Sequence, residues 1–211
     1  MPRTASSSDG RFKFVGGDVA LDFVNTVDWT TAGPVNDRLE DARAFAAWAF
    51  AAGLLGRSEE ARLAKATAGV AETKLLRRVR QVRRVLKALF DSLGAATPGA
   101  ATADAFSAEL RRAMAHVDFD AGRAPGSARL RFRGVEPWDP VLDAVVYAAV
   151  QLATSPEATR VRVCAGRDCG WIYVDRSRNG LRRWCEMSTC GARQKARAYY
   201  RRKRAATARD V

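Results

Sequence analysis

The sequence predicts a mainly α-helical protein with short β elements, in which a helical N-terminal domain precedes a compact cysteine-containing module and a basic C-terminal helix. Three observations support this prediction. Apolar residues recur at helical spacing over most of the first 154 positions, all four cysteines lie within 27 residues near the C-terminus, and the last segment is rich in arginine. With 211 residues, 47% of them hydrophobic, the chain has room for one ordinary domain and a small second one.

The first domain begins after a polar start. We expect residues 1–10 to be disordered and residues 11–154 to form the helical domain. Arg11–Val15 alternates aromatic or apolar residues with basic ones and predicts a short strand. Asp18 is placed to cap a short helix, and Thr30–Pro34 is expected to be loop.

Helical periodicity accounts for most of this domain. Asp37 is expected to begin a helix that Gly53 ends, and Ser58 to begin the next. The clearest helix spans about Val70–Leu93, where apolar residues follow a coiled-coil-like seam; we interpret it as a core helix with a solvated arginine face. The remaining elements are a helix around Phe106–Val117, a hairpin of Val117–Asp120 with Arg129–Arg133, and a helix that begins at Asp139–Pro140.

Thr154–Pro156 is the predicted boundary, and residues 157–206 form the second module. Its cysteines have the spacing C-x4-C-x15-C-x4-C. Two close pairs separated by a short loop suit tetrahedral Zn²⁺, because each pair presents two thiolates from one turn. One structural Zn²⁺ is therefore predicted, with no open position for catalytic water, held by Cys164, Cys169, Cys185 and Cys190. The alternative, two disulfides, does not suit an intracellular chain.

The order of turns in this module is typical of treble-clef-like fingers. The first cysteine pair precedes a strand-like segment, Trp171–Val174, and the last cysteine stands just ahead of a helix over Gly191–Arg204. The arginines of that helix at positions 193, 197, 201 and 204 share one face. Ala192, Ala196 and Tyr199 lie on a neighbouring face, which we expect to pack on the zinc hairpin.

Charge is concentrated at the C-terminal end. The chain has a net charge of +13; residues 160–211 hold 15 Lys and Arg against 4 Asp and Glu, a net of +11, and the rest of the chain has a net of only +2. Such asymmetry favours a polyanionic partner, most often nucleic acid, over the alternative of a solvated basic tail. DNA is the predicted partner, and RNA is possible.

Arginine suits this role because it grips phosphate bidentately or reads guanine, and glutamine can address adenine. The residues predicted to bind nucleic acid are Arg178, Arg182, Arg183, Arg193, Gln194, Arg197, Arg201 and Arg204. Aromatic residues interleaved with these arginines also fit unstacked RNA bases, and a finger that binds a protein partner is a third alternative.

The module resembles the CGNR zinc-finger proteins. The resemblance rests on the four cysteines and on the stretches Asp175–Asn179, Arg183–Met187, Cys190–Arg193 and Lys195–Ala196. The N-terminal part resembles the ABATE domain in Gly16–Asp18, Leu21–Thr26, Trp48 and Gly53–Leu55. The resemblance implies a bacterial, stress-induced transcription regulator whose finger binds DNA. The family pattern has Asn where this chain has Ala192, which argues against a polar contact there.

The helical domain is a candidate sensor or dimerisation unit. Polar and aromatic groups near its first helix are candidate ligand contacts for an unknown small-molecule effector: Asp22, Asn25, Thr26 and Trp29. The alternative for Asp22 and Asn25 is that each braces local backbone. A homodimer would extend a DNA contact and match a two-fold operator.

We expect a cytoplasmic protein without membrane partners or enzymatic activity. The N-terminus lacks an apolar signal segment, and no apolar run approaches the ~20 residues that cross a bilayer. The single histidine, His116, lies among apolar positions, no phosphate-binding glycine loop is present, and no cysteine remains as a nucleophile once the metal is bound.

Overall fold

Helices make up most of the structure. The computed structural model describes residues 10–30, 32–95 and 97–207, so the disorder expected for residues 1–10 falls, except for Gly10, outside the described residues. Over the described ranges the helical elements are α1 (Val19–Val24), α2 (Ala42–Ala51), α3 (Arg57–Ala66), α4 (Val70–Ala95), α5 (Ala100–Met114), α6 (Asp139–Ala153), the 3-10 turn η1 (Pro156–Arg160), the π-helical turn η2 (Met187–Gly191) and α7 (Ala192–Thr207). The predicted fold class, mainly α with short β elements, is confirmed.

The strands form short antiparallel pairs. In the described part of the chain these are β1 (Asp28–Thr30) with β2 (Gly33–Val35), β3 (Val117–Asp120) with β4 (Arg129–Phe132), and β5 (Val161–Val163) with β6 (Ile172–Val174). The expected hairpin of β3 and β4 is present, with Val117 opposite Phe132.

Two expectations about β structure are wrong. Arg11–Val15 is not a strand and belongs to none of the strand pairs found over the described ranges. The segment Thr30–Pro34 was expected to be loop, but its described residues contribute to the β1–β2 hairpin. Strands of three residues are too short to show the alternation that a sequence pattern needs.

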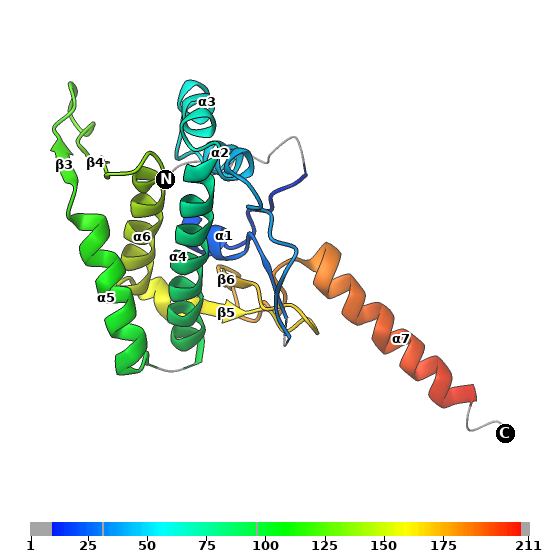
Figure 1. The fold of residues 1–211 in the computed structure, drawn as a ribbon. Coiled ribbons are helices and arrows are strands. Elements are labelled where there is room, and N and C mark those ends of the chain that lie inside the picture. The colour runs from blue at the N-terminus through cyan, green and yellow to red at the C-terminus, as the bar shows by residue number, and fades with distance from the viewer. Residues whose placement is uncertain (1–9, 31, 96, 208–211) are drawn as a thin grey trace.

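The long helix α4 lies at the centre of the core. Leu75, Val79, Val82 and Leu86 are fully buried, at the alternating steps that the sequence predicts for a seam. Helices α5 and α6 pack beside α4, and Figure 1 shows the three running side by side. Burial of each large apolar side chain contributes roughly 1.5–3 kcal/mol, so this seam is a main source of stability.

Acidic and glycine caps fix where the helices begin. Asp18 caps α1 through its side chain, as expected. The helix expected to begin at Asp37 begins later, as α2, with Asp41 as its cap. The carboxylate of Asp37 is instead engaged by a buried arginine of α4. Helix α3 follows Gly56 rather than Ser58.

The segment that follows α6 shares the core of the helical region. Val161, Ile172 and Val174 of the β5–β6 pair are buried in the same cluster as the helices. A second, smaller cluster consists of the cysteines with Trp171 and Tyr173. The cysteine module is therefore packed directly onto the helices.

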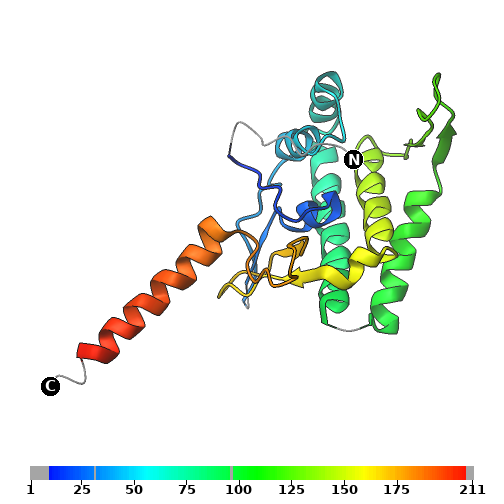
Figure 2. The ribbon, with the colours of Figure 1, turned by 180° about the vertical axis from the view of Figure 1, so that it is seen from behind.

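Helix α7 leaves this body. It projects away from the other elements in both views of the ribbon (Figures 1 and 2), and its main contacts are with η2. The expected packing of Ala196 and Tyr199 on the zinc hairpin is wrong: both are exposed, Tyr199 to 56%. The turn η2 leads directly into α7, which runs outward from it. None of the described helices is both long and apolar enough to span a membrane.

Candidate metal centre and nucleic-acid interface

Four cysteine side chains meet at one point of the C-terminal module. Cys164 follows β5, Cys169 precedes β6, Cys185 lies in the next loop and Cys190 lies in η2. Their sulfur atoms all lie within 4.8 Å of one another, and no disulfide joins them. The Cys185 Sγ lies 3.8 Å from the Cys169 Sγ and 3.7 Å from the Cys190 Sγ. Metal–sulfur bonds of ~2.3 Å in a tetrahedron give a sulfur–sulfur edge of about 3.8 Å, so the cluster fits a metal site.

The surroundings of Cys164 favour its thiolate form. The Cys164 Sγ accepts the backbone N–H groups of Gly166 at 3.4 Å and Cys185 at 3.3 Å. Thiol hydrogen bonds from Cys169 and Cys185 lower the pKa of Cys164 to about 2, whereas donation to Cys164 raises the pKa of Cys185. Four thiolates at this spacing can coexist only around a cation. Gly166 leaves room for them, because a Cβ there would lie 3.1 Å from the Cys190 Sγ.

Arg182 holds the loop between the two cysteine pairs. Its Nε donates to the Trp184 carbonyl at 2.9 Å, and its Nη2 donates to the carbonyls of Cys185 and, at 3.3 Å, Val15. Its guanidinium carbon lies 4.2 Å from the centre of the Tyr173 ring. Arg182 is among the residues that the sequence predicts to bind nucleic acid. In the structure the Nε and Nη2 atoms of its guanidinium are bonded to protein carbonyls, and nucleic-acid binding by Arg182 stays a prediction.

The turn after β6 fastens the module to the N-terminal region. The Asp175 carboxylate accepts the Ser177 hydroxyl and backbone N–H, and the hydroxyl bond is the main reason that the pKa of Asp175 is lowered. The next residue, Arg176, donates to the Gly17 carbonyl at 2.9 Å. It also pairs with both oxygens of Glu157 at 2.7 and 2.8 Å.

Strand β6 is seated on the segment that follows α1. The Asn25 carboxamide bonds both the N–H and the carbonyl of Ile172. The Gly170 N–H donates to the Trp29 carbonyl at 2.9 Å, and a Cβ at Gly170 would lie 2.6 Å from the Trp29 Cβ. The indole N–H of Trp171 donates to a backbone carbonyl of the same segment. These contacts require glycine at position 170 and bring the two segments into direct contact.

The candidate ligand contacts near α1 face the protein interior. Asp22, Asn25 and Thr26 are each buried to 3% exposure or less. Asp22 accepts the Gly16 N–H at 2.8 Å, and burial raises the pKa of Asp22 to about 7. Asn25 braces the distant β6 rather than local backbone. Over the described ranges these three side chains are therefore buried against other protein groups, whereas Trp29 borders a cavity.

A basic hollow, which we term the arginine groove, lies between α7 and the first cysteine turn. It is lined by Arg167, Gln194, Arg197, Tyr200, Arg201 and Arg204. Three of the four arginines predicted to form a stripe thus lie together, with Gln194 beside them. Arg167 was missed because the sequence argument followed helical spacing. Its position between two metal ligands was the available signal.

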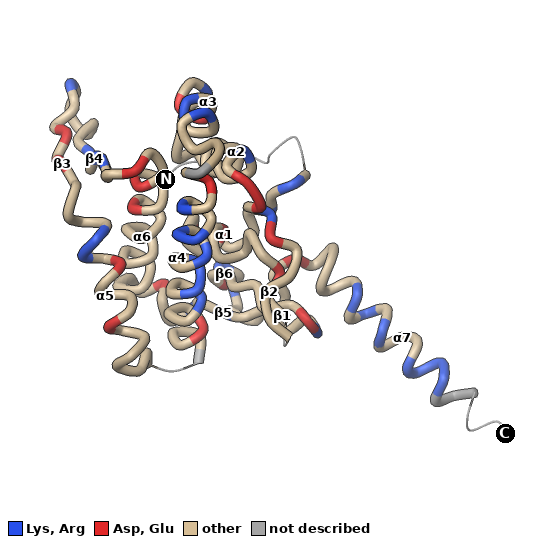
Figure 3. The backbone as a smooth tube through the Cα atoms, viewed as in Figure 1, with Lys and Arg blue, Asp and Glu red and all other residues tan. Residues whose placement is uncertain are grey.

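The other predicted contacts are dispersed. Arg193 borders a different cavity, and Arg178 and Arg183 are exposed on the loop before the second cysteine pair. The Arg183 guanidinium lies 5.5 Å from the centre of the Trp184 ring. Helix α7 as a whole holds seven Lys and Arg and no Asp or Glu, and Figure 3 shows the blue positions recurring along it with no red among them.

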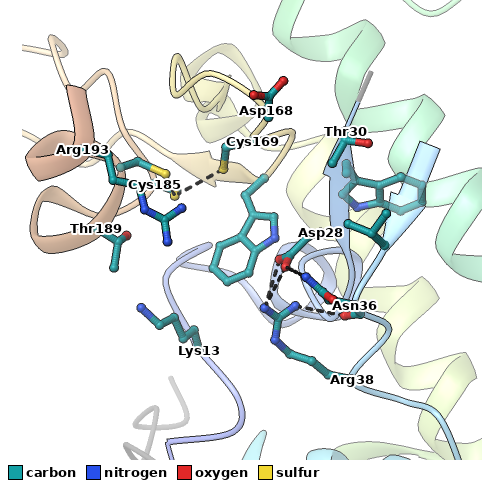
Figure 4. Close-up of a pocket in the computed structure, with 14 residues that line it drawn as sticks. Lys13, Asp28, Thr30, Asn36, Arg38, Asp168, Cys169, Cys185, Thr189 and Arg193 are labelled. Atoms are coloured by element: carbon teal, nitrogen blue, oxygen red, sulfur yellow. Dashed lines mark hydrogen bonds and ion pairs between the residues drawn. The ribbon is translucent and has the colours of Figure 1, made fainter. Parts of the chain in front are cut away.

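The second cavity lies where the cysteine cluster meets the β1–β2 hairpin, and we term it the junction cavity (Figure 4). Its lining comes from the N-terminal segment, the hairpin, the cysteine cluster and the first turn of α7. It includes Lys13, Trp29, Arg38, Trp171 and Arg193, together with three of the four cysteines.

Comparison with known families agrees with this division. Residues 17–156 match the model of ABATE, described as a putative stress-induced transcription regulator. The chain belongs to the ABATE family. Residues 160–203 match the CGNR zinc finger, so both parts of the expected resemblance are confirmed, in the expected order. Among curated proteins, none matches the chain.

Several of the ABATE residues on which the resemblance rests form hydrogen bonds with the CGNR finger. The Gly16 carbonyl accepts the Val174 N–H at 2.8 Å, the Gly17 carbonyl accepts Arg176, and Asn25 holds β6. The start of the ABATE region therefore forms the surface against which the finger packs.

Proposed function

We propose that this protein is a zinc-dependent, DNA-binding transcription regulator. The observation that carries the proposal is the isolation of α7, an exposed helix with seven basic and no acidic residues that contacts mainly η2. A helix of this length is only marginally stable in water on its own. Because α7 buries little apolar surface, packing against the core does not explain why it is helical. Seven basic residues with no acidic residue among them favour a polyanion as the partner of this helix.

One Zn²⁺ in the four-cysteine cluster anchors this helix. Four thiolates in a tetrahedron are the ligand set of structural zinc, and a closed shell leaves no position for water. Cys190 lies in η2, the turn from which α7 emerges, so metal binding fixes the point at which the helix leaves the body. The ion thereby positions the DNA-binding surface and takes no part in chemistry.

Duplex DNA fits the dimensions of this surface. A 16-residue helix is roughly 24 Å long, and the major groove, about 12 Å wide, admits one α-helix. In the arginine groove, Arg167 faces Arg197 and Arg201 from the cysteine turn, so a phosphate strand lying there meets cations from two sides. Gln194 at the same hollow is placed to address an adenine edge.

RNA is the second candidate, and one observation favours it. Tyr199 and Tyr200 are exposed to 56% and 63%, and their rings lie 5.6 Å apart. Exposed aromatic rings on a basic helix suit stacking with unpaired bases. Competition between duplex DNA and single-stranded RNA of equal length separates the two functions.

Selection of bound fragments from the fragmented genome of the source organism tests the proposal. Zinc-loaded protein at physiological salt is expected to enrich a few promoter-proximal fragments. Uniform weak recovery would show that α7 reads only phosphate, and preference for the RNA competitor would replace DNA with RNA as the partner.

A matched pair of charge variants tests the surface itself. Arg197→Ala with Arg201→Ala removes two charges from the arginine groove, and we expect the slope of log K against log salt to flatten by about 1.8. Lys195→Ala with Arg202→Ala removes two charges from the opposite face of α7 and is expected to flatten the slope by less than half as much. Equal effects of the two pairs would mean that the arginine groove has no special role.

A further inference from the structure

The junction cavity has the dimensions of a small-molecule site. Its volume is about 380 Å³, within the range of roughly 300–1,000 Å³ that ligand pockets occupy. Lys13 borders it from the N-terminal segment, Trp29 from the β1–β2 hairpin, and Arg193 from the first turn of α7. A molecule bound here would touch three segments at once.

One side of the cavity is cationic. Figure 4 shows the ends of Lys13, Thr189 and Arg193 converging there. Lys13 pairs with Glu186 at 2.5 Å, and the Thr189 hydroxyl donates to the same carboxylate at 3.0 Å. Within the described ranges Arg193 is exposed and has no ion-pair or hydrogen-bond partner. Lys13, Glu186 and Arg193 together carry one net positive charge, which a monoanion would balance.

The other side of the cavity is aromatic. The indole N–H groups of Trp29 and Trp171 already donate to backbone carbonyls, at 2.9 and 3.0 Å. These two side chains therefore offer a ligand only the parts of their rings that border the cavity, since Lys87 lies 5.4 Å from the centre of the Trp29 ring and Trp171 is 7% exposed. Arg38 lies over the Trp171 ring at 5.3 Å and is paired with Asp28, so its charge is already compensated. A flat apolar group fits this side better than a second charge.

We propose that the junction cavity binds a small aromatic carboxylate. The ring packs against Trp29 and Trp171, and the carboxylate accepts hydrogen bonds from Arg193 and Lys13. A metal-loaded four-thiolate cluster carries a formal charge of −2 and also borders the cavity. Figure 4 shows Cys185 beside Arg193, so the two cations have to offset this negative charge for a carboxylate to bind between them.

Binding at this site also reaches α7. A carboxylate between Lys13 and Arg193 ties the first turn of α7 to the N-terminal segment and occupies one arginine of the basic helix. We therefore expect the ligand to weaken DNA binding; this part of the inference rests on the proposed function, whereas the existence of the site does not.

Calorimetric titration of zinc-loaded, full-length protein without DNA tests the site. The probes are benzoate, benzamide, which lacks the charge, and acetate, which lacks the ring. We expect benzoate to bind and each of the other two to bind at least about tenfold more weakly. Equal binding of benzoate and acetate would leave no role for the indoles, and no binding of benzoate would overturn the proposal.

Two variants test the assigned contacts. Arg193→Ala is expected to weaken benzoate binding at least about tenfold. Arg202→Ala removes the same charge from a different face of α7 and is expected to leave benzoate binding unchanged. Zinc content and the helical circular dichroism signal are measured on both. If Arg193 serves only to offset the thiolate charge, Arg193→Ala will lower zinc affinity and benzoate will not bind the parent protein.

The link to α7 is tested separately by measuring DNA affinity with and without saturating benzoate. We expect weaker binding and a salt slope smaller by about 0.9, equivalent to one lost phosphate contact. Benzoate binding without any change in DNA affinity would overturn the link and leave the site standing. A protein that binds benzoate but no DNA would refute the proposed function alone.

Discussion

The Asn25 side chain acts as a strand partner for Ile172, 147 residues away in the sequence. Its Nδ2 donates to the Ile172 carbonyl at 2.8 Å, and its Oδ1 accepts the Ile172 N–H at 2.9 Å. Both residues are buried. Strand β5 pairs with one edge of β6, so Asn25 completes the hydrogen bonding of the other edge.

Asn25→Ala is expected to destabilise the whole chain by about 2–4 kcal/mol. The substitution leaves the Ile172 N–H and carbonyl buried without partners, and each such group costs roughly 1–3 kcal/mol. Urea unfolding of zinc-loaded protein measures the change. Gln151→Ala removes an exposed carboxamide from α6 and is the control, expected within about 0.5 kcal/mol of the parent. Equal stability of the two variants would mean that β6 is held without Asn25.

Cys185→Ser is expected to abolish stoichiometric zinc binding and to destabilise more than the finger. Val161, Ile172 and Val174 belong to the core of the helices, so loosening the cysteine module exposes that core as well. We expect a loss on the order of 5 kcal/mol or more in the free energy of unfolding, because structural zinc contributes directly to folding. Zinc content and helix unfolding are measured together. Ser188→Ala, at an exposed position of the neighbouring turn η2, is the control. A variant that unfolds only in the finger would contradict the shared core.

Arg182 and Arg183 are adjacent in sequence but have different surroundings. Arg182→Ala removes donors to three backbone carbonyls around the cysteine loop and is expected to cost about 1–3 kcal/mol. Arg183 is exposed, and Arg183→Ala is expected to change stability by less than about 0.5 kcal/mol. In DNA titrations, Arg183→Ala should flatten the salt slope by up to about 0.9. If Arg183→Ala lowered stability and Arg182→Ala did not, the structural role of Arg182 would be refuted.

Arg167 is expected to add one phosphate contact to those of α7. Its side chain borders the arginine groove from the turn between two cysteine ligands, opposite Arg197 and Arg201. Arg167→Ala should therefore reduce the salt slope of DNA binding by about 0.9 without loss of zinc. Arg123→Ala, an exposed arginine in the loop between β3 and β4, is the control with the same charge change. If both variants behave alike, the groove does not contact phosphate.

The parts of this structure that depend on local spacing could be predicted from the sequence. The cysteine pairs lie within single turns, so the spacing of Cys164 with Cys169 and of Cys185 with Cys190 was enough to bring four ligands together. Helical spacing likewise placed Arg197, Arg201 and Arg204 on one face. The buried seam of α4 follows from the same 3.6-residue period.

The parts that depend on distant partners could not be predicted. Asp22, Asn25 and Thr26 have the polar character of a binding site. Only the position of β6 shows that this part of the chain packs against the strand. The direction of α7 is set by η2, and no pattern within the helix reveals that Ala196 and Tyr199 stay exposed. The junction cavity joins Lys13 to Arg193, which no local motif connects.

Asp143 is a buried carboxyl group of α6 with charged residues of α4 and α5 nearby. Burial, followed by repulsion from Asp139 and Glu109, raises the pKa of Asp143 to about 7, although Arg78 and Arg112 act in the opposite direction. A raised pKa means that the folded protein holds this proton more tightly than the unfolded chain. The stability that the proton provides is therefore complete below about pH 4 and declines as the pH rises to about 7, where the folded carboxyl ionises.

Asp143→Asn mimics the protonated group at every pH. We expect the variant to be more stable than the parent by on the order of 1–3 kcal/mol at about pH 8, and to lose less stability between about pH 4 and pH 7. Some decline should remain, because burial also raises the pKa of Asp22 to about 7. Urea unfolding across this range, with the exposed Asp104→Asn on α5 as control, measures the difference. A parent and variant with parallel pH profiles would show that Asp143 stays ionised in the folded protein.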